Sequence, residues 1–462
     1  MYFLSRHYQL NRILSLLNSV FFLNVFNILT FVGSFPFLSI SLFPWIYLLF
    51  KKSIEQKKNL FLLAFILSLA IYAGSIYVFI MSSMAVSIET IYFSFAKKRT
   101  RYILFLLAAF SLAILFAIPK LLPMTELLIQ YPRHIELTPS PGFFNINNIK
   151  TALLELKYFF FSGDSIYLFF TSEKAGIFGY NFSLITILIL ILSHFLLWKR
   201  NKILVVMSII FLFLALGDNS PLNIWRTLHH FFASFKEPYK FFIILLSIYA
   251  LSIGLTLKEI EAKIAHKKIS KFIVFSMFFV ISFNALVCAN KIFKEKIIIG
   301  YKLDNQREEF FQTHGNAKQM FATVYNNQAV VYGYDTFGNQ IQTKVVPKGR
   351  KDYRGEYFLE GDSGEARQLF FSPNKLKFNV NVYQDDVLVI NQNYFSGWRS
   401  STGKVINYGG LIGIPVSKKE REVTVYYLPG SFIIGAVILI SFLLITIYMR
   451  LKKCRIPRLF SQ

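Results

Sequence analysis

The stretch SFIIGAVILISFLLITIYMR, residues 431–450, contains no charged side chain before its last residue, Arg450. A helix needs roughly 20 apolar residues to cross a bilayer, so this stretch is long enough to be a transmembrane helix. Further apolar blocks occur at 13–33, 36–50, 60–77, 80–95, 102–118, 182–198, 203–217, 240–256 and 271–290. Together they predict a polytopic α-helical membrane protein with about ten spans.

The charge pattern indicates how these spans are oriented. The chain has 462 residues, 54% of them hydrophobic, and a formal net charge of +25. Such a charge first suggests a nucleic-acid binder, but Lys and Arg occur in short clusters between apolar blocks. The clusters are SRHYQLNR, KKSIEQKK, AKKRTR, WKRNK, KIAHKKISK and RLKKCRIPR, and they fall at every second boundary. We therefore predict a multi-pass protein of the bacterial inner membrane with both termini cytoplasmic and no nucleic-acid partner.

Three segments then lie outside the membrane: 119–181, 218–239 and about 291–430. The first two are outer loops of a helical bundle spanning 1–290, and the third is long enough for a domain. Its runs at 328–337, 355–362, 375–384, 386–395 and 422–430 are rich in Val, Tyr and Phe. In LKFNVNV (376–382) apolar residues alternate with polar ones, which is typical of a sheet with one buried face. We expect an extracytoplasmic antiparallel β-sandwich at 291–430, followed by the last transmembrane helix and a basic tail at 431–462.

The stretch NYFSGWRSSTGKVINYGG, residues 393–410, has the turn residues of a β-hairpin. Its Trp398 has alternative roles: a platform on which a sugar stacks, a core residue, or a ring at the membrane interface. The two cysteines, Cys288 and Cys454, offer neither a disulfide framework nor metal-ligand spacing. No glycine-rich nucleotide fingerprint follows a strand. The sequence therefore predicts no metal and no cofactor.

The C-terminal sequence resembles that of YfhO-like bacterial membrane proteins. Those proteins end with an aromatic pair, Pro-Gly-Trp, a short hairpin, a Val-Pro-x-Gly turn, Tyr-x-Pro-x-x-Phe and a final span. The matching residues are Tyr394, Phe395, Gly397, Trp398, Gly410, Pro415, Tyr427, Pro429 and Phe432. Ser396 replaces the usual Pro, and Thr402–Gly403 stands where Asp-Gly is usual.

Other parts of the chain resemble the same family. AIPKLLPMTELLIQYPR (117–133) is similar to its Pro-x-x-Leu-Pro-x-x-Glu motif with a following Arg, and VVYGYDT (330–336) to a Gly-Tyr-Asp stretch. LGDNSPLNIWRTLHHFFASFKEPYKF (216–241) resembles a third family motif, with Lys236 and Lys240 where Arg is common. The resemblance implies a polyprenyl-phosphate-dependent glycosyltransferase of the GT-C type, whose substrate would be a lipid-linked sugar in the outer leaflet.

The resemblance also implies an acidic residue in the first large outer loop, because the chemistry needs a carboxylate as base or metal ligand. This chain has no Asp or Glu before Glu55. The catalytic residue is therefore unknown, and whether the chain alone is an enzyme is open. We expect either a fragment lacking the opening span and catalytic loop, or a separately encoded N-terminal part that associates with it. A third explanation is that another carboxylate serves.

Charged residues at the outer boundaries are the candidates for substrate binding. Glu126 and Arg133 follow the span 102–118 and supply a carboxylate and a phosphate-binding guanidinium. The second outer segment is cationic, where the positive-inside rule would not place cations; its candidates are Arg226, His229, Lys236 and Lys240. A polyprenyl phosphate would explain both groups. The alternatives are a solvated helix face and attraction to anionic lipid headgroups.

Two other function classes stay open. A transporter or flippase for a lipid-linked glycan would need a polar path through the spans, where Glu89 is a rare charge. Ser82 and Ser83 lie near it, so Glu89 has the alternative of pairing within the bundle. A non-enzymatic envelope scaffold would use the sandwich to bind a partner. Asp164 and Glu173 are further candidate bases, with ordinary loop charges as the alternative.

Overall fold

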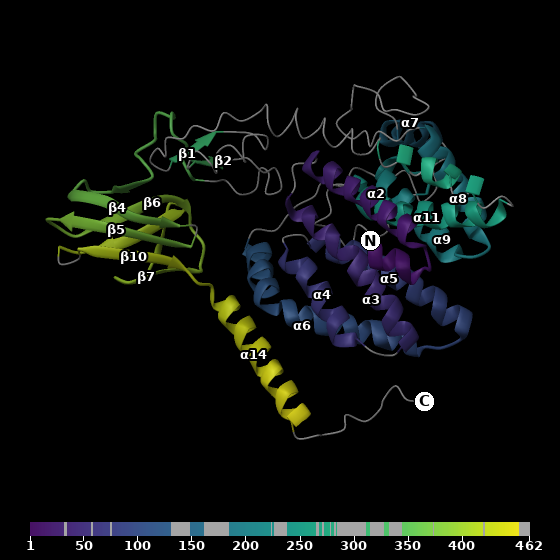
Figure 1. Cartoon of the computed structure of the whole chain (residues 1–462). Coiled ribbons are helices and arrows are strands. Elements are labelled where there is room, and N and C mark those ends of the chain that lie inside the picture. The colour runs from purple at the N-terminus through teal and green to yellow at the C-terminus, as the bar shows by residue number, and fades with distance from the viewer. Residues whose placement is uncertain are drawn as a thin grey trace. The chain divides into compact units, whose positions relative to one another are not determined.

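The protein divides into two compact units, which are described here separately (Figure 1). The computed structural model describes residues 1–31, 35–56, 59–73, 76–130, 148–160, 184–222, 224–225, 238–264, 268–269, 272–277, 279–280, 283, 311–314, 328–331, 344–372, 374–418 and 421–451. The first unit comprises Met1–Ala117, His134–Gly300 and Arg455–Gln462. The second comprises Ile118–Arg133 and Tyr301–Cys454.

Helices make up the described part of the first unit. They are α1 (Tyr2–His7), α2 (Arg12–Phe31), α3 (Phe43–Gln56), α4 (Leu60–Tyr72), α5 (Ile76–Lys97), the first part of α6 (Arg101–Gln130), α7 (Asn148–Phe160), α8 (Leu184–Trp198), α9 (Lys202–Leu216) and α11 (Phe242–Lys263). Short 3₁₀ segments, η1 (Phe35–Leu42), η2 (Gly217–Asn219) and η3 (Pro238–Phe241), join some of them. The apolar run 60–95 forms two helices, as predicted, but its break lies between Tyr72 and Ile76, earlier than the predicted break between 77 and 80.

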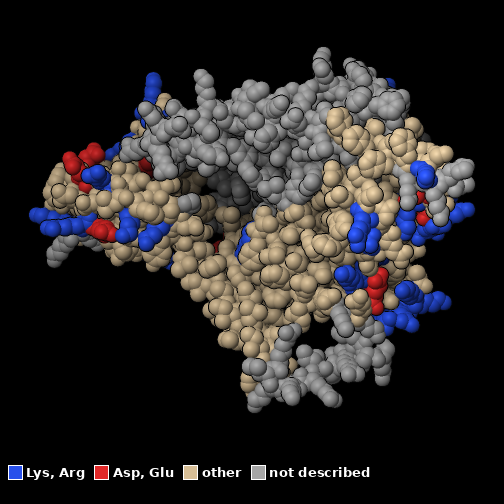
Figure 2. Space-filling model, in the orientation of Figure 1, with Lys and Arg blue, Asp and Glu red and all other residues tan. Residues whose placement is uncertain are grey.

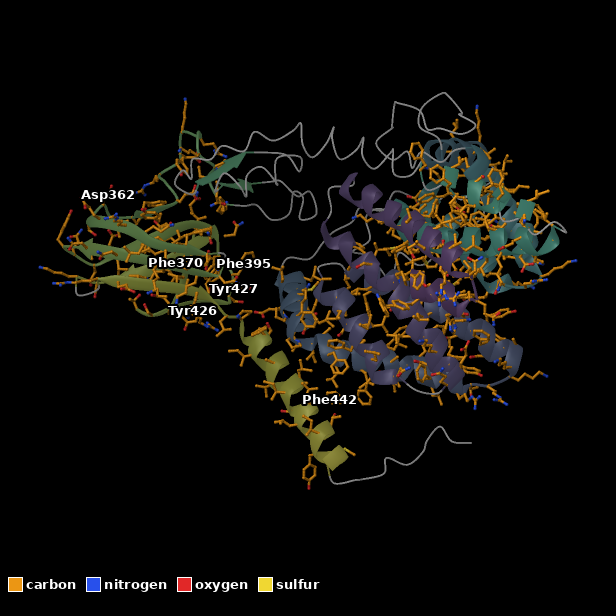
Figure 3. The ribbon with its side chains drawn as sticks, in the orientation of Figure 1. Asp362, Phe370, Phe395, Tyr426, Tyr427 and Phe442 are labelled. Atoms are coloured by element: carbon orange, nitrogen blue, oxygen red, sulfur yellow. The ribbon has the colours of Figure 1, made fainter. Side chains whose placement is uncertain are left out.

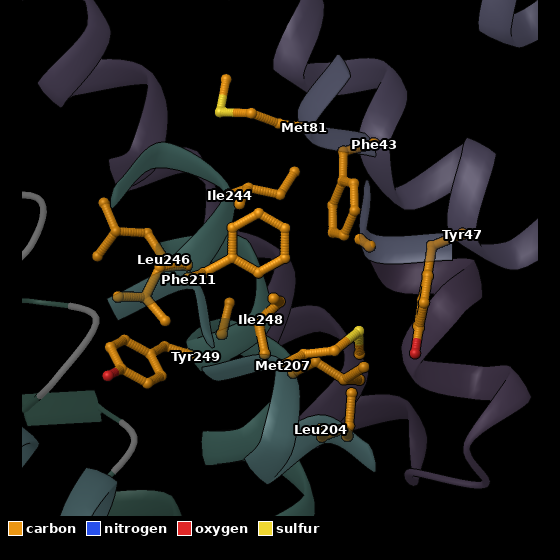
Figure 4. Close-up of a cluster of buried hydrophobic side chains, with 14 of the residues drawn as sticks. Phe43, Tyr47, Met81, Leu204, Met207, Phe211, Ile244, Leu246, Ile248 and Tyr249 are labelled. Carbon is orange, nitrogen blue, oxygen red and sulfur yellow. The ribbon is translucent and has the colours of Figure 1, made fainter. Parts of the chain in front are cut away.

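Helix α11 forms the centre of this unit. Every residue from Phe242 to Leu257 is buried. Because protein surrounds this helix on every side, apolar residues are favoured all round it. It packs against α2, α8 and α9. Figure 4 shows its Ile244 and Ile248 beside Phe211 and Met207 of α9. Side chains from α3 and α5 complete this core, which is continuous through the unit.

Five described helices are long and apolar enough to cross a membrane: Ile76–Lys97, Arg101–Ile129, Lys202–Asn219, Phe242–Lys263 and Gly430–Met449. Shorter apolar helices occupy Arg12–Phe22, Leu60–Tyr72 and Ile187–Trp198. These findings support membrane association, whereas ten spans remain a prediction. The predicted span 36–50 is part 3₁₀ helix and part α3, and the predicted span 271–290 lies largely outside the described residues.

Charged side chains are unevenly distributed over the surface. On the face seen in Figure 2, uncharged side chains predominate, and Lys and Arg occur in groups. Many large apolar side chains of the helices are exposed, for example Phe95 at 81% and Phe195 at 73%. Such surfaces are costly in water and suit contact with lipid.

The second unit contains a β-sandwich of two four-stranded sheets. One sheet has the order β4 (Gly364–Ser372), β5 (Lys375–Val382), β10 (Glu422–Tyr427), β7 (Trp398–Ser400). The other has the order β3 (Tyr357–Leu359), β6 (Asp386–Asn393), β9 (Leu411–Val416), β8 (Ile406–Tyr408). All described pairings in these sheets are antiparallel. Alternate residues of both sheets, such as Phe378, Val425 and Ile412, form one core between them.

The predicted antiparallel sandwich is therefore confirmed for residues 357–427, whereas its extracytoplasmic position remains a prediction. The strand predicted at 328–337 differs from expectation. Its first residues form β2 (Gln328–Val331), which pairs in parallel with β1 (Phe311–His314) outside the two sheets. Residues 332–337 lie outside the described part of the chain. Strand β4 was not predicted, because its sequence GEARQLFFS lacks regular alternation; a bulge between Gln368 and Phe370 explains the irregular pattern.

The prediction that 393–410 forms one hairpin is wrong. Strand β7 pairs with β10 and β8 pairs with β9, so the two strands lie in opposite sheets. The connection through Gly403 therefore crosses between the edges of the sandwich. The hairpin of this region is instead β8–β9, closed by Gly409 and Gly410 with φ of +56° and +96°. Positive φ at both residues is what a tight two-residue turn requires.

Helix α14 (Gly430–Leu451) leaves the sandwich and crosses the last part of α6. A Cβ atom on Gly435 would lie 2.7 Å from Cα of Pro119 and 2.9 Å from the carbonyl oxygen of Ile118. The two backbones can approach this closely only because Gly435 has no side chain. Only 6% of the apolar window of α14 is buried, so the rest of its surface is free to contact lipid.

We predict that Gly435→Leu destabilises this crossing, because the new side chain would overlap backbone that cannot rotate away. The cost should be about 1–3 kcal/mol, measured as a lower Tm of the purified protein in detergent. Gly430→Ala is the matched control, since a Cβ there meets no atom within 4 Å. Equal Tm values for the two variants would contradict the crossing.

Asp386 fixes the start of β6 in the sandwich. Its carboxylate accepts hydrogen bonds from the backbone N–H groups of Gly361 at 2.9 Å and Ser363 at 3.2 Å, and from the Ser363 hydroxyl. Partial burial by itself raises the pKa of Asp386, but these hydrogen bonds outweigh it and hold the pKa below the ordinary 3.8. The ionised group therefore stabilises the fold above that value, and this contribution is lost as the pH falls through the lowered pKa.

We expect Asp386→Asn to reduce the free energy of unfolding by about 1–3 kcal/mol at neutral pH, because an amide places a donor against backbone donors. The difference from wild type should shrink only as the pH falls below about 4, toward the lowered pKa of Asp386. Denaturant unfolding at several pH values measures it. A pH-independent difference would show that the charge of Asp386 is not what matters.

Candidate functional site

The first candidate site surrounds Glu126 in the second unit. Helix α6 continues without interruption through Pro119 and Pro123 to Gln130, further than the predicted span 102–118. Thirty residues of helix are about 45 Å long, against about 30 Å for the hydrocarbon core. Glu126 is 25 residues beyond Arg101, or ~38 Å along the axis. If Arg101 lies at one boundary of the core, Glu126 therefore lies past the opposite boundary.

Both carboxylate oxygens of Glu126 accept hydrogen bonds from serine hydroxyl groups. Ser396 donates to Oε1 at 2.8 Å from the connection after β6, and Ser431 donates to Oε2 from the first turn of α14. The first turn of α14 has no acidic residue of its own. Glu126 supplies negative charge at this helix N-terminus, where the unpaired N–H groups and the helix dipole favour an anion.

Residues of the C-terminal motif pack directly beside this carboxylate. Leu428 N–H donates to the carbonyl of Gly397 at 2.8 Å, and the Trp398 and Tyr427 rings meet edge to face at 5.3 Å. A Cβ on Gly397 would lie 2.7 Å from the Tyr427 ring, so only glycine fits. Trp398 is 7% exposed and belongs to the sandwich core. Its interpretation as a sugar-stacking platform is therefore wrong.

A second candidate site lies in the first unit, where the two ends of the segment 216–241 meet. Gly217 has φ of +56°, and a Cβ on it would lie 2.3 Å from Cγ of Pro238. Only glycine combines this backbone conformation with this contact. Asn148 at the start of α7 donates from Nδ2 to the carbonyls of Asp218 at 2.8 Å and Ser220 at 3.2 Å. The Gly217–Pro238 contact holds η2 against η3, and the Asn148 hydrogen bonds tie α7 to η2.

Lys240 lies on η3 at this place. Its side chain is buried, with the residue 6% exposed, and its Nζ lies 4.5 Å from the centroid of the Tyr77 ring. A buried ammonium over an aromatic face gains a cation–π attraction that partly replaces its hydration. A cation held in this way has lost most of its water already, so binding an anion would cost it little further desolvation.

The structure describes two of the six predicted substrate-binding residues. Glu126 belongs to the second unit and Lys240 to the first, and their grouping in one site remains a prediction. Arg133, Arg226, His229 and Lys236 lie outside the described residues, as do Asp164 and Glu173. Among the residues that the structure describes, no three His, Cys, Asp or Glu side chains form a possible metal site.

The alternative that Glu89 pairs within the bundle is confirmed, but sequence reasoning missed its partner. Lys51 of α3 and Glu89 of α5 form an ion pair with 2.8 Å between Nζ and Oε1, and their side chains are 13% and 0% exposed. The ammonium also lies 5.0 Å from the centroid of the Phe93 ring. The sequence assigned Lys51 to the basic cluster KKSIEQKK, and nothing local could show that it turns inward to another helix.

Polar groups surround this pair. Within the described part of the chain, the second oxygen of Glu89 and the hydroxyls of Tyr8 and Tyr47 are buried without a hydrogen bond of normal geometry. Tyr47 interacts electrostatically with both Glu89 and Tyr8. A buried ion pair in this setting is expensive to form, and more expensive to break on one side only.

Comparison with known proteins gives no assignment for either site. Neither protein-family models, nor curated proteins, nor solved structures include a match to this chain.

We predict that Glu89→Leu or Lys51→Met alone lowers the free energy of unfolding by about 3–5 kcal/mol, because each leaves one buried charge without its partner. The double variant should cost less than either single change. Thermal unfolding in detergent measures all three. Arg200→Met is the control, since Arg200 is 66% exposed in its pair with Glu259 and should contribute at most about 1 kcal/mol. Additive losses in the double variant would contradict the coupling.

Proposed function

We propose that this protein is a YfhO-like, GT-C-type membrane protein that binds a lipid-linked sugar for modification of a cell-envelope glycan. The observation that carries the proposal is the contact of Glu126 with Ser396 and Ser431. Glu126 comes from the family's Pro-x-x-Leu-Pro-x-x-Glu motif, and the two serines stand within its C-terminal motif. Motifs separated by 270 residues of chain therefore share one place in the fold.

The third family motif supports the same proposal. The close contact between Gly217 and Pro238 joins the start and end of segment 216–241, and it positions Lys240 on the Tyr77 ring. An ammonium in this position suits a phosphate or diphosphate, since a charge-assisted hydrogen bond to an anion is stronger than one between neutral groups. In this proposal Lys240 binds the lipid phosphate, and Arg226, His229 and Lys236 of the same unit are further candidates for it.

Glu126 has a positioning role in this proposal. A carboxylate whose two oxygens already accept hydrogen bonds from hydroxyl groups is a poor base for removing a proton from the molecule that receives the sugar. It instead holds the end of α6 against α14 and the β6–β7 connection.

A second function, transport of a lipid-linked glycan, is favoured by a different observation. The Lys51–Glu89 pair and the hydroxyls of Tyr8 and Tyr47 place ionisable groups between helices of the bundle. Such groups in a membrane protein often belong to a translocation pathway. In this alternative the pair opens and closes during transport, and the sandwich has no catalytic partner.

The test is binding of a fluorescent polyprenyl phosphate to the purified protein in nanodiscs, followed by transfer of a radiolabelled sugar from the corresponding lipid-linked donors. We expect Lys240→Met to weaken binding on the order of tenfold, the loss of about one charge-assisted contact. Glu126→Ala should impair binding less and reduce transfer. Lys351→Ala, an exposed lysine of the sandwich, is the matched control.

Size-exclusion profiles confirm that each variant is folded before binding is compared. Absence of polyprenyl-phosphate binding by the wild type would refute the proposal, and so would unchanged binding by Lys240→Met. Binding without transfer, accompanied by movement of the lipid between leaflets of a vesicle, would favour the transport function instead.

A further inference from the structure

The two outer faces of the sandwich differ. In the β3–β6–β9–β8 sheet, the outward residues Val389 and Asn391 are 0% and 2% exposed, and Asn391 exchanges hydrogen bonds with the backbone of Val346 at 2.9 and 2.8 Å. That face is therefore covered. On the other sheet, Phe370 is 49% and Tyr426 38% exposed. Neighbouring exposed apolar side chains on one surface often mark an interaction site.

Strand register places these two rings on the same face. Phe370 is opposite Lys377, which is opposite Thr424. Tyr426 lies two residues from Thr424 along β10, opposite both Lys375 and Arg399. The rings are thus two strands and two residues apart, or ~12 Å by standard sheet spacing. A short oligosaccharide spans that distance. Figure 3 shows both rings on the sandwich.

Among the described residues of this open sheet face, cations outnumber carboxylates. Its cations are Arg367, Lys375, Lys377 and Arg399, and its carboxylates are Glu365 and Glu422. One of these carboxylates, Glu422, forms an ion pair with Lys377, with 3.1 Å between Oε1 and Nζ. The face seen in Figure 2 also shows Lys and Arg side chains on the sandwich. The surplus of positive charge favours an anionic partner.

Amide side chains complete the surface. Asn379 and Asn381 are exposed on β5, and Asn379 lies opposite Arg367. An amide offers both donors and an acceptor, which match the vicinal hydroxyl groups of a sugar. A bilayer would be a poor partner, because amides and paired carboxylates would lose water without gaining hydrogen bonds in hydrocarbon.

We propose that the open sheet face binds an acidic polysaccharide, with pyranose rings on Phe370 and Tyr426 and its carboxylates at the surrounding Lys and Arg side chains. This site is separate from the lipid-phosphate site of the proposed function. It requires no lipid-linked donor, and it would serve to hold the envelope polymer beside the membrane.

Three soluble polymers test the proposal on the full-length protein in nanodiscs: polygalacturonate, which is an acidic glycan; dextran, which is neutral; and poly-glutamate, which is anionic without sugar rings. We expect polygalacturonate to bind more tightly than either of the others. Phe370→Leu and Tyr426→Leu should each weaken it about three- to tenfold, whereas Phe370→Tyr should retain it. Lys404→Ala, outside this face, should leave it unchanged.

If dextran bound as tightly as polygalacturonate, charge would have no role in binding. If poly-glutamate bound as tightly as polygalacturonate, stacking of sugars on Phe370 and Tyr426 would have no role. Quenching of Tyr426→Trp fluorescence by brominated lipid would show that the face docks on the bilayer, which overturns the proposal. Melting curves of each variant show that the sandwich is intact. Because the assay contains no polyprenyl phosphate, its failure leaves the proposed function standing, and failure of that function leaves this result standing.

Discussion

The fold depends on one constraint: every apolar helix surface must meet either another helix or lipid. Helix α11 meets the first condition, because all residues from Phe242 to Leu257 are buried inside its unit. Helix α14 suits the second, because almost none of its apolar window is buried within the structure. Both satisfy their backbone hydrogen bonds internally, as hydrocarbon requires. Composition alone cannot distinguish the two cases, since both sequences are apolar all round, and only the packing shows which helix is central.

The sequence therefore predicted the fold class better than it predicted which strands pair with each other. Period-two alternation in β5 identified a buried sheet face correctly, because that signal depends on one strand alone. The assignment of 393–410 to one hairpin failed for the opposite reason. Gly403 and its neighbours permit a turn, but whether the flanking strands pair depends on β10 and β9, which are distant in sequence. Strand β4 escaped prediction because its bulge breaks the alternation.

The candidate sites show the same division between local and non-local information. Glu126 and Lys240 could be identified in the sequence as candidates because both are charged and both lie next to apolar blocks. Their partners could not: two serines meet Glu126 from elements far along the chain, and Tyr77 lies under Lys240 from another helix. Lys51 is the clearest case, because a lysine in a basic cluster gives no sign that it pairs inward with Glu89. Interhelical contacts of this kind follow from tertiary packing alone.

The edge strands of the two sheets affect whether copies of the protein associate when they are confined to a membrane plane. Edge strands β7, β8 and β3 have three residues each, too few to offer a row of unpaired backbone groups to another chain. The longer edge strand, β4, carries Glu365, Arg367 and a bulge, all of which oppose strand addition. Two-dimensional confinement raises the local concentration of neighbouring sandwiches. Short, charged and bulged edges keep these domains from joining into continuous sheets at high density.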